Sequence, residues 1–168
     1  MTDDQRIPPS KVADDRASLT SFLDHQRATL AVKCAGLTGE QLKRKAVPTS
    51  GLTLLGLVRH AAAVERSWFR LVVNAEDVRP PWPGEVDGTF AEFHVEDADV
   101  DEAFETWREE CARSRAVTAS VESLDDTVDF RGETISLRYV LTHMIEEYAR
   151  HNGHADLLRE AIDGAVGE

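Results

Sequence analysis

Residues 136–164 read SLRYVLTHMIEEYARHNGHADLLREAIDG, and this stretch has the pattern of one long amphipathic helix. Ser136 can cap its start, because a serine hydroxyl accepts a hydrogen bond from a free N–H group of the first turn. Gly164 can end it, since glycine tolerates the left-handed conformation common after helices. Gly153 is expected to weaken it, at a cost of about 1 kcal/mol relative to alanine. The expected core stripe consists of Leu137, Leu141, Met144, Ile145 and Tyr148.

A polar ridge runs beside this stripe. At about 100° per residue, His143, Glu147, His151 and His154 fall on one flank of the helix. The steps from His143 to Glu147 and from Glu147 to His151 are four residues each, so these side chains stack one turn apart. Two side chains at this spacing can reach one metal ion. The same pattern is also common on polar helix faces that bind nothing, and for this helix alone both interpretations remain open.

Three other segments have helical patterns, and together they predict an all-α four-helix bundle. The first begins at Ser10 and ends near Gly36, with Val12, Leu19, Phe22, Leu23, Leu30 and Val32 as its apolar residues. The second is capped by Ser50 and carries the stripe Leu54, Leu57, Val58, Ala61, Glu65, Trp68 and Val72. The third covers residues 99–121, with Val100, Phe104, Trp107 and Cys111 on one side.

The connections between the helices show weaker patterns. Thr38 and Gln41 match a capping box, which predicts a short helix. Residues 74–88 are rich in proline, and no regular element is expected there. A short β excursion is predicted at 127–130, followed by a turn at Arg131-Gly132. Residues 1–9 are expected to form a flexible arm, and residues 10–168 a single domain.

His60 lies on the flank of the second long helix, about 120° from the centre of its apolar stripe. Two helices that pack in a bundle bring such flanks together at the edge of the core, where bundles build metal sites from histidine and carboxylate side chains. His60, Glu147 and His151 therefore form a candidate ligand set. The roles of Glu65, Tyr148 and Arg150 stay open: Glu65 is unusual on an apolar stripe unless it is paired, for example with an arginine.

Composition excludes several classes of function. The net charge is −12, and the 15 arginines are scattered among carboxylates, so binding to nucleic acid is not expected. No run approaches the roughly 18 apolar residues of a membrane span, and the first residues lack the apolar core of a signal peptide. We therefore expect a cytoplasmic protein with no membrane contact. Cys34 and Cys111 are expected to be reduced helix residues rather than a disulfide or catalytic thiols.

The sequence resembles the DinB/YfiT-like superfamily of metalloproteins, and within it the actinobacterial mini-circle proteins. The segments that carry the resemblance are FLDHQRATLAVKCAGLTGEQL, VPTSGLTLLGLVRHAAAVERSWFR, DADVDEAFETWREECARSR and SLRYVLTHMIEEYARHNGHADLLREAIDG. The resemblance implies an up-down-down-up four-helix bundle that pairs as a homodimer.

The resemblance also implies a divalent metal held by one histidine of the second long helix and an HxxxH pair of the last. His60 and His151 match two of these positions, and Glu147 stands where the usual pattern has a histidine. A His-Glu-His set is similar to that of the mycothiol-dependent maleylpyruvate isomerases, which use it around zinc. The implied ligands are His60, Glu147 and His151, with His154 and His143 as second choices. Zinc is expected first, and nickel, iron or manganese would also suit these ligands.

Two imidazoles and one carboxylate leave a coordination position open, as catalytic zinc sites do. A thiol bound there becomes a thiolate, which is a better nucleophile. By resemblance, the expected function is to transfer a mycothiol-type or bacillithiol-type thiol to an electrophile, or to isomerise a substrate through a thiol adduct. Two alternatives are a metal-binding or stress-response protein without turnover, and a metal-free bundle that serves as an interaction module.

Overall fold

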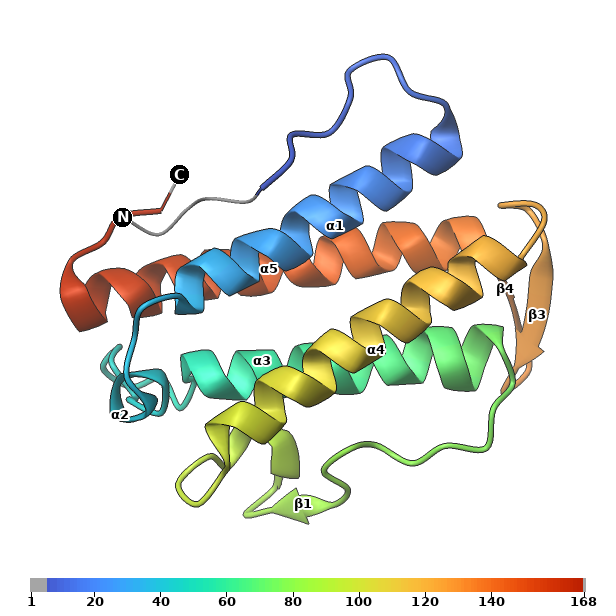
Figure 1. Ribbon diagram of the computed structural model, residues 1–168. Coiled ribbons are helices and arrows are strands. Elements are labelled where there is room, and N and C mark those ends of the chain that lie inside the picture. The colour runs from blue at the N-terminus through green and yellow to red at the C-terminus, as the bar shows by residue number, and fades with distance from the viewer. Residues whose placement is uncertain (1–5, 168) are drawn as a thin grey trace.

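Four long helices lie side by side in the computed structural model, which describes residues 6–167 (Figure 1). They are α1 (Asp15–Cys34), α3 (Leu54–Glu65), α4 (Val100–Ser120) and α5 (Leu137–Asp163). Helix α1 packs mainly on α5, and α3 packs on both α4 and α5. Helices α1 and α5 run in one direction and α3 and α4 in the other, which is the up-down-down-up order (Figure 1). The predicted four-helix bundle is confirmed.

Each long helix begins at a short polar residue that accepts a hydrogen bond from the third residue of the helix. These residues are Asp14, Thr53, Asp99 and Ser136. Helix α5 ends at Gly164, whose φ of 79° places it in the left-handed region. The short helix α2 (Gly39–Leu42) has the predicted capping box between Thr38 and Gln41. The caps satisfy backbone N–H groups that the helices leave free, and they fix the boundaries.

Changing Ser136 to alanine is expected to lower the free energy of unfolding by about 1 kcal/mol. The substitution removes the hydroxyl that accepts from the Tyr139 N–H group at 3.1 Å. Urea denaturation followed by circular dichroism measures the loss. Ser136→Thr keeps an acceptor and serves as the control. Equal stability of the alanine and threonine variants would contradict the role of this cap.

The structure corrects the predicted boundaries of two helices. Helix α1 starts five residues after Ser10, because Asp14 caps it, and Val12 precedes it at 95% exposure. Phe22, predicted on the apolar stripe, is 48% exposed. Ser50 does not cap α3: its hydroxyl accepts from the Leu52 N–H group in a turn, and Thr53 is the cap.

Helix α3 continues into η1 (Arg66–Val73), a π-helix in which the Asn74 N–H group donates to the carbonyl of Phe69, five residues earlier. The wider turn changes the register of the predicted stripe. Phe69 is fully buried, whereas Trp68 is half-buried and packs against Tyr139 and His143. By contrast, α5 runs through Gly153 as one continuous helix.

Two small antiparallel hairpins connect the long helices. Strand β1 (Glu85–Val86) pairs with β2 (Thr89–Phe90), which corrects the expectation that residues 74–88 contain no regular element. Asp87 and Gly88 both have positive φ, as a tight hairpin turn requires. Strand β3 (Thr127–Phe130) pairs with β4 (Glu133–Ser136) around Arg131-Gly132, so the predicted β excursion and its turn are confirmed.

The core contains a buried ion pair. Glu65 on α3 is fully buried, and it accepts two hydrogen bonds of 2.7 Å from Arg27 on α1, which is 5% exposed. Tyr148 donates to the same carboxylate at 2.8 Å. Burial raises the pKa of Glu65, but the Arg27 charge and these hydrogen bonds outweigh it, so that pKa is lowered. The expected arginine partner of Glu65 is therefore present.

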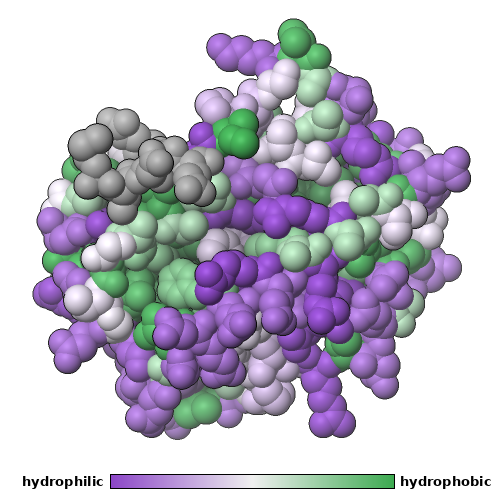
Figure 2. Space-filling view, in the orientation of Figure 1, coloured by the Kyte–Doolittle hydropathy of each residue, from purple (hydrophilic) through white to green (hydrophobic). Residues whose placement is uncertain are grey.

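The surface and the chain ends are described for residues 6–167. Hydrophilic side chains predominate across the face formed by α1 and α4 (Figure 2). In the described part of the chain, no helix is both long and apolar enough to cross a bilayer. The predicted arm, residues 1–9, falls partly on residues 1–5, which lie outside the described residues. Residues 6–9 form no helix or strand.

Candidate metal centre

The packing of α3 against α5 brings His60, Glu147 and His151 together. The distance from His60 Nε2 to Glu147 Oε1 is 3.0 Å, and that from His151 Nε2 to the same oxygen is 3.3 Å. One ligand atom from each residue lies within 4.8 Å of those of the other two. All three side chains are half-buried. The predicted four-residue step on α5 and the single histidine of α3 therefore meet at one point.

The spacing of these atoms fits a tetrahedral ion. Ligand atoms about 2.0–2.1 Å from zinc lie about 3.3 Å apart at tetrahedral angles. The cavity that His60, Glu147 and His151 line has a volume of about 10 Å³, the size of a single small occupant. Leu57, Ala61 and Val64 supply the apolar side of this cavity. The three residues could hold one divalent ion without a rearrangement of the helices.

The pKa of each of the three residues is shifted by burial and by its neighbours. Burial lowers the pKa of His60, but hydrogen bonds to Glu92 and Glu147 outweigh it, so that pKa is raised. Burial raises the pKa of Glu147, but His60 and His151 outweigh it, so that pKa is lowered. Burial and the neighbouring His60 lower the pKa of His151. Glu147 is thus ionised and His151 neutral, the forms in which both bind metals.

Glu92 is a residue of this site that the sequence did not reveal. It lies in the short 3₁₀ helix η2 (Ala91–Phe93), and its Oε1 is 3.2 Å from His60 Nδ1. The neighbouring Phe93 stacks on the His60 ring with 5.0 Å between centroids. No helical or strand period places Glu92 beside His60, because a long irregular connection carries it there. The sequence carries no signal that separates Glu92 from the other carboxylates of this connection.

The second-choice histidines lie beside the group rather than in it. His154 Nδ1 is 3.3 Å from His151 Nδ1, which places it behind one candidate ligand. The His143 ring packs at 4.6 Å from the ring of Trp68, and its Nδ1 is 3.6 Å from Glu146. His154 is therefore adjacent to the site, and His143 is one turn away from Glu147.

Three residues whose roles the sequence left open now have positions. Tyr148 is buried, donates to Glu65 and accepts from the Trp107 indole at 2.8 Å. Arg150 is exposed, pairs with Glu146, and lies 4.0 Å from Glu147 Oε2. Tyr148 therefore belongs to the core network, and Arg150 places an exposed positive charge at the rim of the site.

The cysteines are not part of the site. Cys34 and Cys111 are free and buried. Burial raises the pKa of each thiol to about 12, and in Cys111 the nearby Glu65 charge adds to this. Both thiols therefore remain protonated near neutral pH, and neither is activated as a nucleophile.

Comparisons with known proteins identify the fold and the family of the chain. A conserved protein from Enterococcus faecalis, known from its crystal structure, superposes with a TM-score of 0.64 at 14% identity. The match covers 92% of this chain and 100% of that chain, and at this identity it shows the shared fold. No curated protein matches the sequence significantly. The sequence profile of the mycothiol-S-transferase family matches residues 18–164. The chain therefore belongs to the mycothiol-S-transferase family, as its DinB/YfiT-like resemblance predicted.

Proposed function

We propose that this protein is a metal-dependent transferase that joins a mycothiol-type thiol to a small electrophile. The observation that carries the proposal is the convergence of His60, Glu147 and His151 on one point at metal-ligand spacing. Membership of the mycothiol-S-transferase family supports the choice of thiol.

His60, Glu147 and His151 would hold the ion through two imidazoles and one carboxylate, which leaves a position for the thiol. When bound, the metal supplies a positive charge that lowers the pKa of a thiol in this position. The pKa of Glu147 is lowered and that of His60 is raised, and a histidine binds a metal only in its neutral form, so acidification should weaken metal loading. Arg150 lies at the rim, where it can meet a negatively charged group of the thiol or the electrophile.

A second reaction uses the same residues. Glu147 stands between two histidines, as in the maleylpyruvate isomerases that the sequence resembles. Isomerisation through a reversible thiol adduct is therefore the alternative chemistry. A metal-binding protein without turnover remains the non-enzymatic alternative. Zinc as the metal, a homodimeric assembly and a cytoplasmic location are part of the proposal.

The proposal is tested with purified protein loaded separately with zinc, nickel, iron(II) or manganese. Thiol consumption is followed with mycothiol and a panel of electrophiles such as bimane and dinitrobenzene halides, with glutathione and cysteine as control thiols. We expect turnover with mycothiol, and its loss when a chelator removes the metal. Stoichiometric metal without thiol consumption would favour the binding protein, and turnover that survives complete metal removal would contradict the mechanism.

A further inference from the structure

We propose that Glu92 is a positioning residue that holds the His60 imidazole in the orientation and tautomer needed to bind the metal. This inference rests on the proposed metal centre and adds to it a residue outside the ligand set. Its basis is the 3.2 Å contact between Glu92 Oε1 and His60 Nδ1, on the edge of the ring away from Glu147.

The two ring nitrogens of His60 have different partners. Nδ1 faces Glu92, and Nε2 faces Glu147 at 3.0 Å, where His151 also converges. If neutral His60 carries its proton on Nδ1, it donates to Glu92 and presents the lone pair of Nε2 to the ion. A carboxylate on the far nitrogen fixes the tautomer and makes the ligating nitrogen more basic.

Glu92 is placed outside the ligand set by the same geometry. Its carboxylate contacts the ring edge that points away from the meeting point of the three ligand atoms. A metal at that point would be separated from Glu92 by the imidazole itself. The residue therefore acts through His60.

The burial of Glu92 makes its contact with His60 energetically important. Glu92 is only 7% exposed, although it belongs to a loop segment. Among the described residues, the His60 ring is its hydrogen-bond partner, and the Arg59 guanidinium interacts with it at longer range. A buried carboxylate is costly unless it is paired. The pairing with His60, a candidate metal ligand, therefore offsets the cost of burying Glu92.

Phe93 restrains the same ring from its face. The rings of Phe93 and His60 are stacked, with an interplanar angle of 27°. Gly56, one turn before His60, faces the same segment: a Cβ there would be in ordinary van der Waals contact with Phe93 Cδ1 at 3.4 Å, and its tight contact would be with Thr53 Oγ1 at 3.0 Å. Edge and face contacts from two consecutive residues leave the imidazole little freedom to rotate.

The test measures zinc affinity by chelator competition in Glu92→Ala, Glu92→Gln and wild-type protein. We expect Glu92→Ala to bind zinc about 10–100-fold more weakly, the usual effect of removing such a partner. Glu92→Gln keeps an acceptor without the charge, so it should lose less. Glu96→Gln is the matched control: the residue lies in the same connection, its side chain is 62% exposed, and zinc affinity should not change.

Two further readouts separate positioning from folding. Cobalt-loaded Glu92→Ala should show an altered visible absorption spectrum, while the metal-free variants should melt within a few degrees of wild type. If Glu92→Ala does not fold, the zinc affinity and the cobalt spectrum of Glu92→Gln test the inference. Wild-type zinc affinity and an unchanged cobalt spectrum in a folded Glu92 variant would overturn the inference. If wild-type protein binds neither zinc nor cobalt, the metal centre itself is wrong, and this inference falls with it.

Discussion

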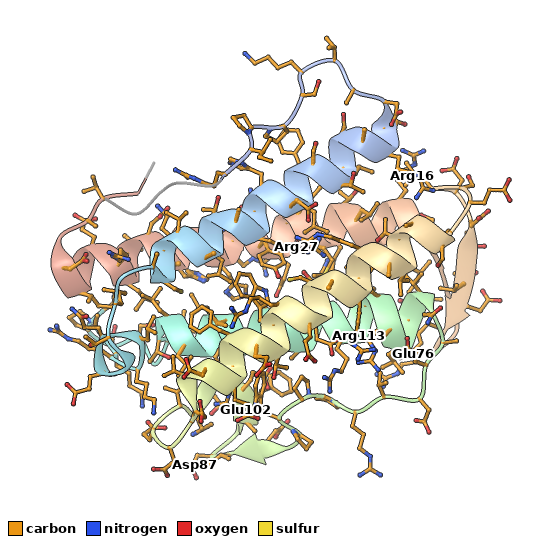
Figure 3. All side chains as sticks on the ribbon, in the orientation of Figure 1. Arg16, Arg27, Glu76, Asp87, Glu102 and Arg113 are labelled. Carbon is orange, nitrogen blue, oxygen red and sulfur yellow. The ribbon has the colours of Figure 1, made fainter. Side chains whose placement is uncertain are left out.

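Replacing Glu65 with alanine is expected to lower the free energy of unfolding by about 3–5 kcal/mol, because it leaves the buried Arg27 charge with only the half-exposed carboxylate of Asp24, at 2.8 Å, as a partner. Arg27 extends from α1 into the space between α1 and α4, and its guanidinium makes both hydrogen bonds to Glu65 (Figure 3). Removal of the carboxylate also takes the acceptor away from the Tyr148 hydroxyl. Urea denaturation of the metal-free protein measures the loss.

The matched control replaces both partners with apolar side chains of similar size. Arg27→Met/Glu65→Leu removes the two charges together, so we expect it to be more stable than Glu65→Ala. The remaining cost is that of the Tyr148 hydroxyl, about 1–3 kcal/mol. A single variant that unfolds like wild type, or a double variant less stable than the single one, would show that the pair does not stabilise the bundle.

The same pair predicts the response of stability to acid. The pKa of Glu65 is lower in the folded chain than in the unfolded one. Its contribution is therefore complete above the unfolded pKa, about 4.3, and is lost as the pH falls through the lower folded pKa. Between pH 5 and the acid limit of folding, wild type should lose stability more steeply than the double variant. Parallel pH profiles would contradict this assignment.

Changing His151 to alanine is expected to weaken zinc binding by more than about 100-fold, which exceeds the usual effect of removing an outer partner. His60→Ala and Glu147→Ala should behave alike, since each removes one of three converging ligand atoms. Metal content after dialysis and zinc competition measure the effect. Thiol transfer should fall with the metal.

Two variants on the same helix sharpen this test. His143 lies one turn from Glu147 on the same ridge, and its ring packs on Trp68. The variant His143→Ala should therefore keep the metal. Glu147→His restores the HxxxH spacing common among relatives, and we expect it to bind metal as well. Metal content that stays at the wild-type level in all three ligand variants would refute the site.

The helix ends and helix faces were predictable from the sequence because they depend on residues close together in the chain. Ser136, Gly164 and the capping box at Thr38 mark helix ends by their own hydrogen-bonding and backbone preferences, and these predictions are confirmed. The meeting of His60 with Glu147 and His151 followed from two helical periods and one packing rule. The spacing of apolar residues shows which face of a helix is buried. Helices in a bundle can pack their buried faces together in only a few ways.

Contacts between residues far apart in the chain could not be predicted from helical spacing. An arginine partner was expected for Glu65, but no spacing selects Arg27, which is 38 residues away in the chain. Val12 fits the apolar period of α1, yet the Asp14 cap excludes it from the helix. Glu92 was missed because its loop has no period, and its contact with His60 depends on the path of 26 residues between η1 and α4.

That path follows from the direction of the helices. Because α3 and α4 are parallel, residues 74–99 must return along the length of the bundle before α4 can begin (Figure 1). An antiparallel pair could be joined by a short turn that never passes the ligands. Here the returning segment places Glu92 and Phe93 against the His60 ring. The surroundings of His60 can therefore change through this segment alone, while the helices that carry the three candidate ligands keep their positions.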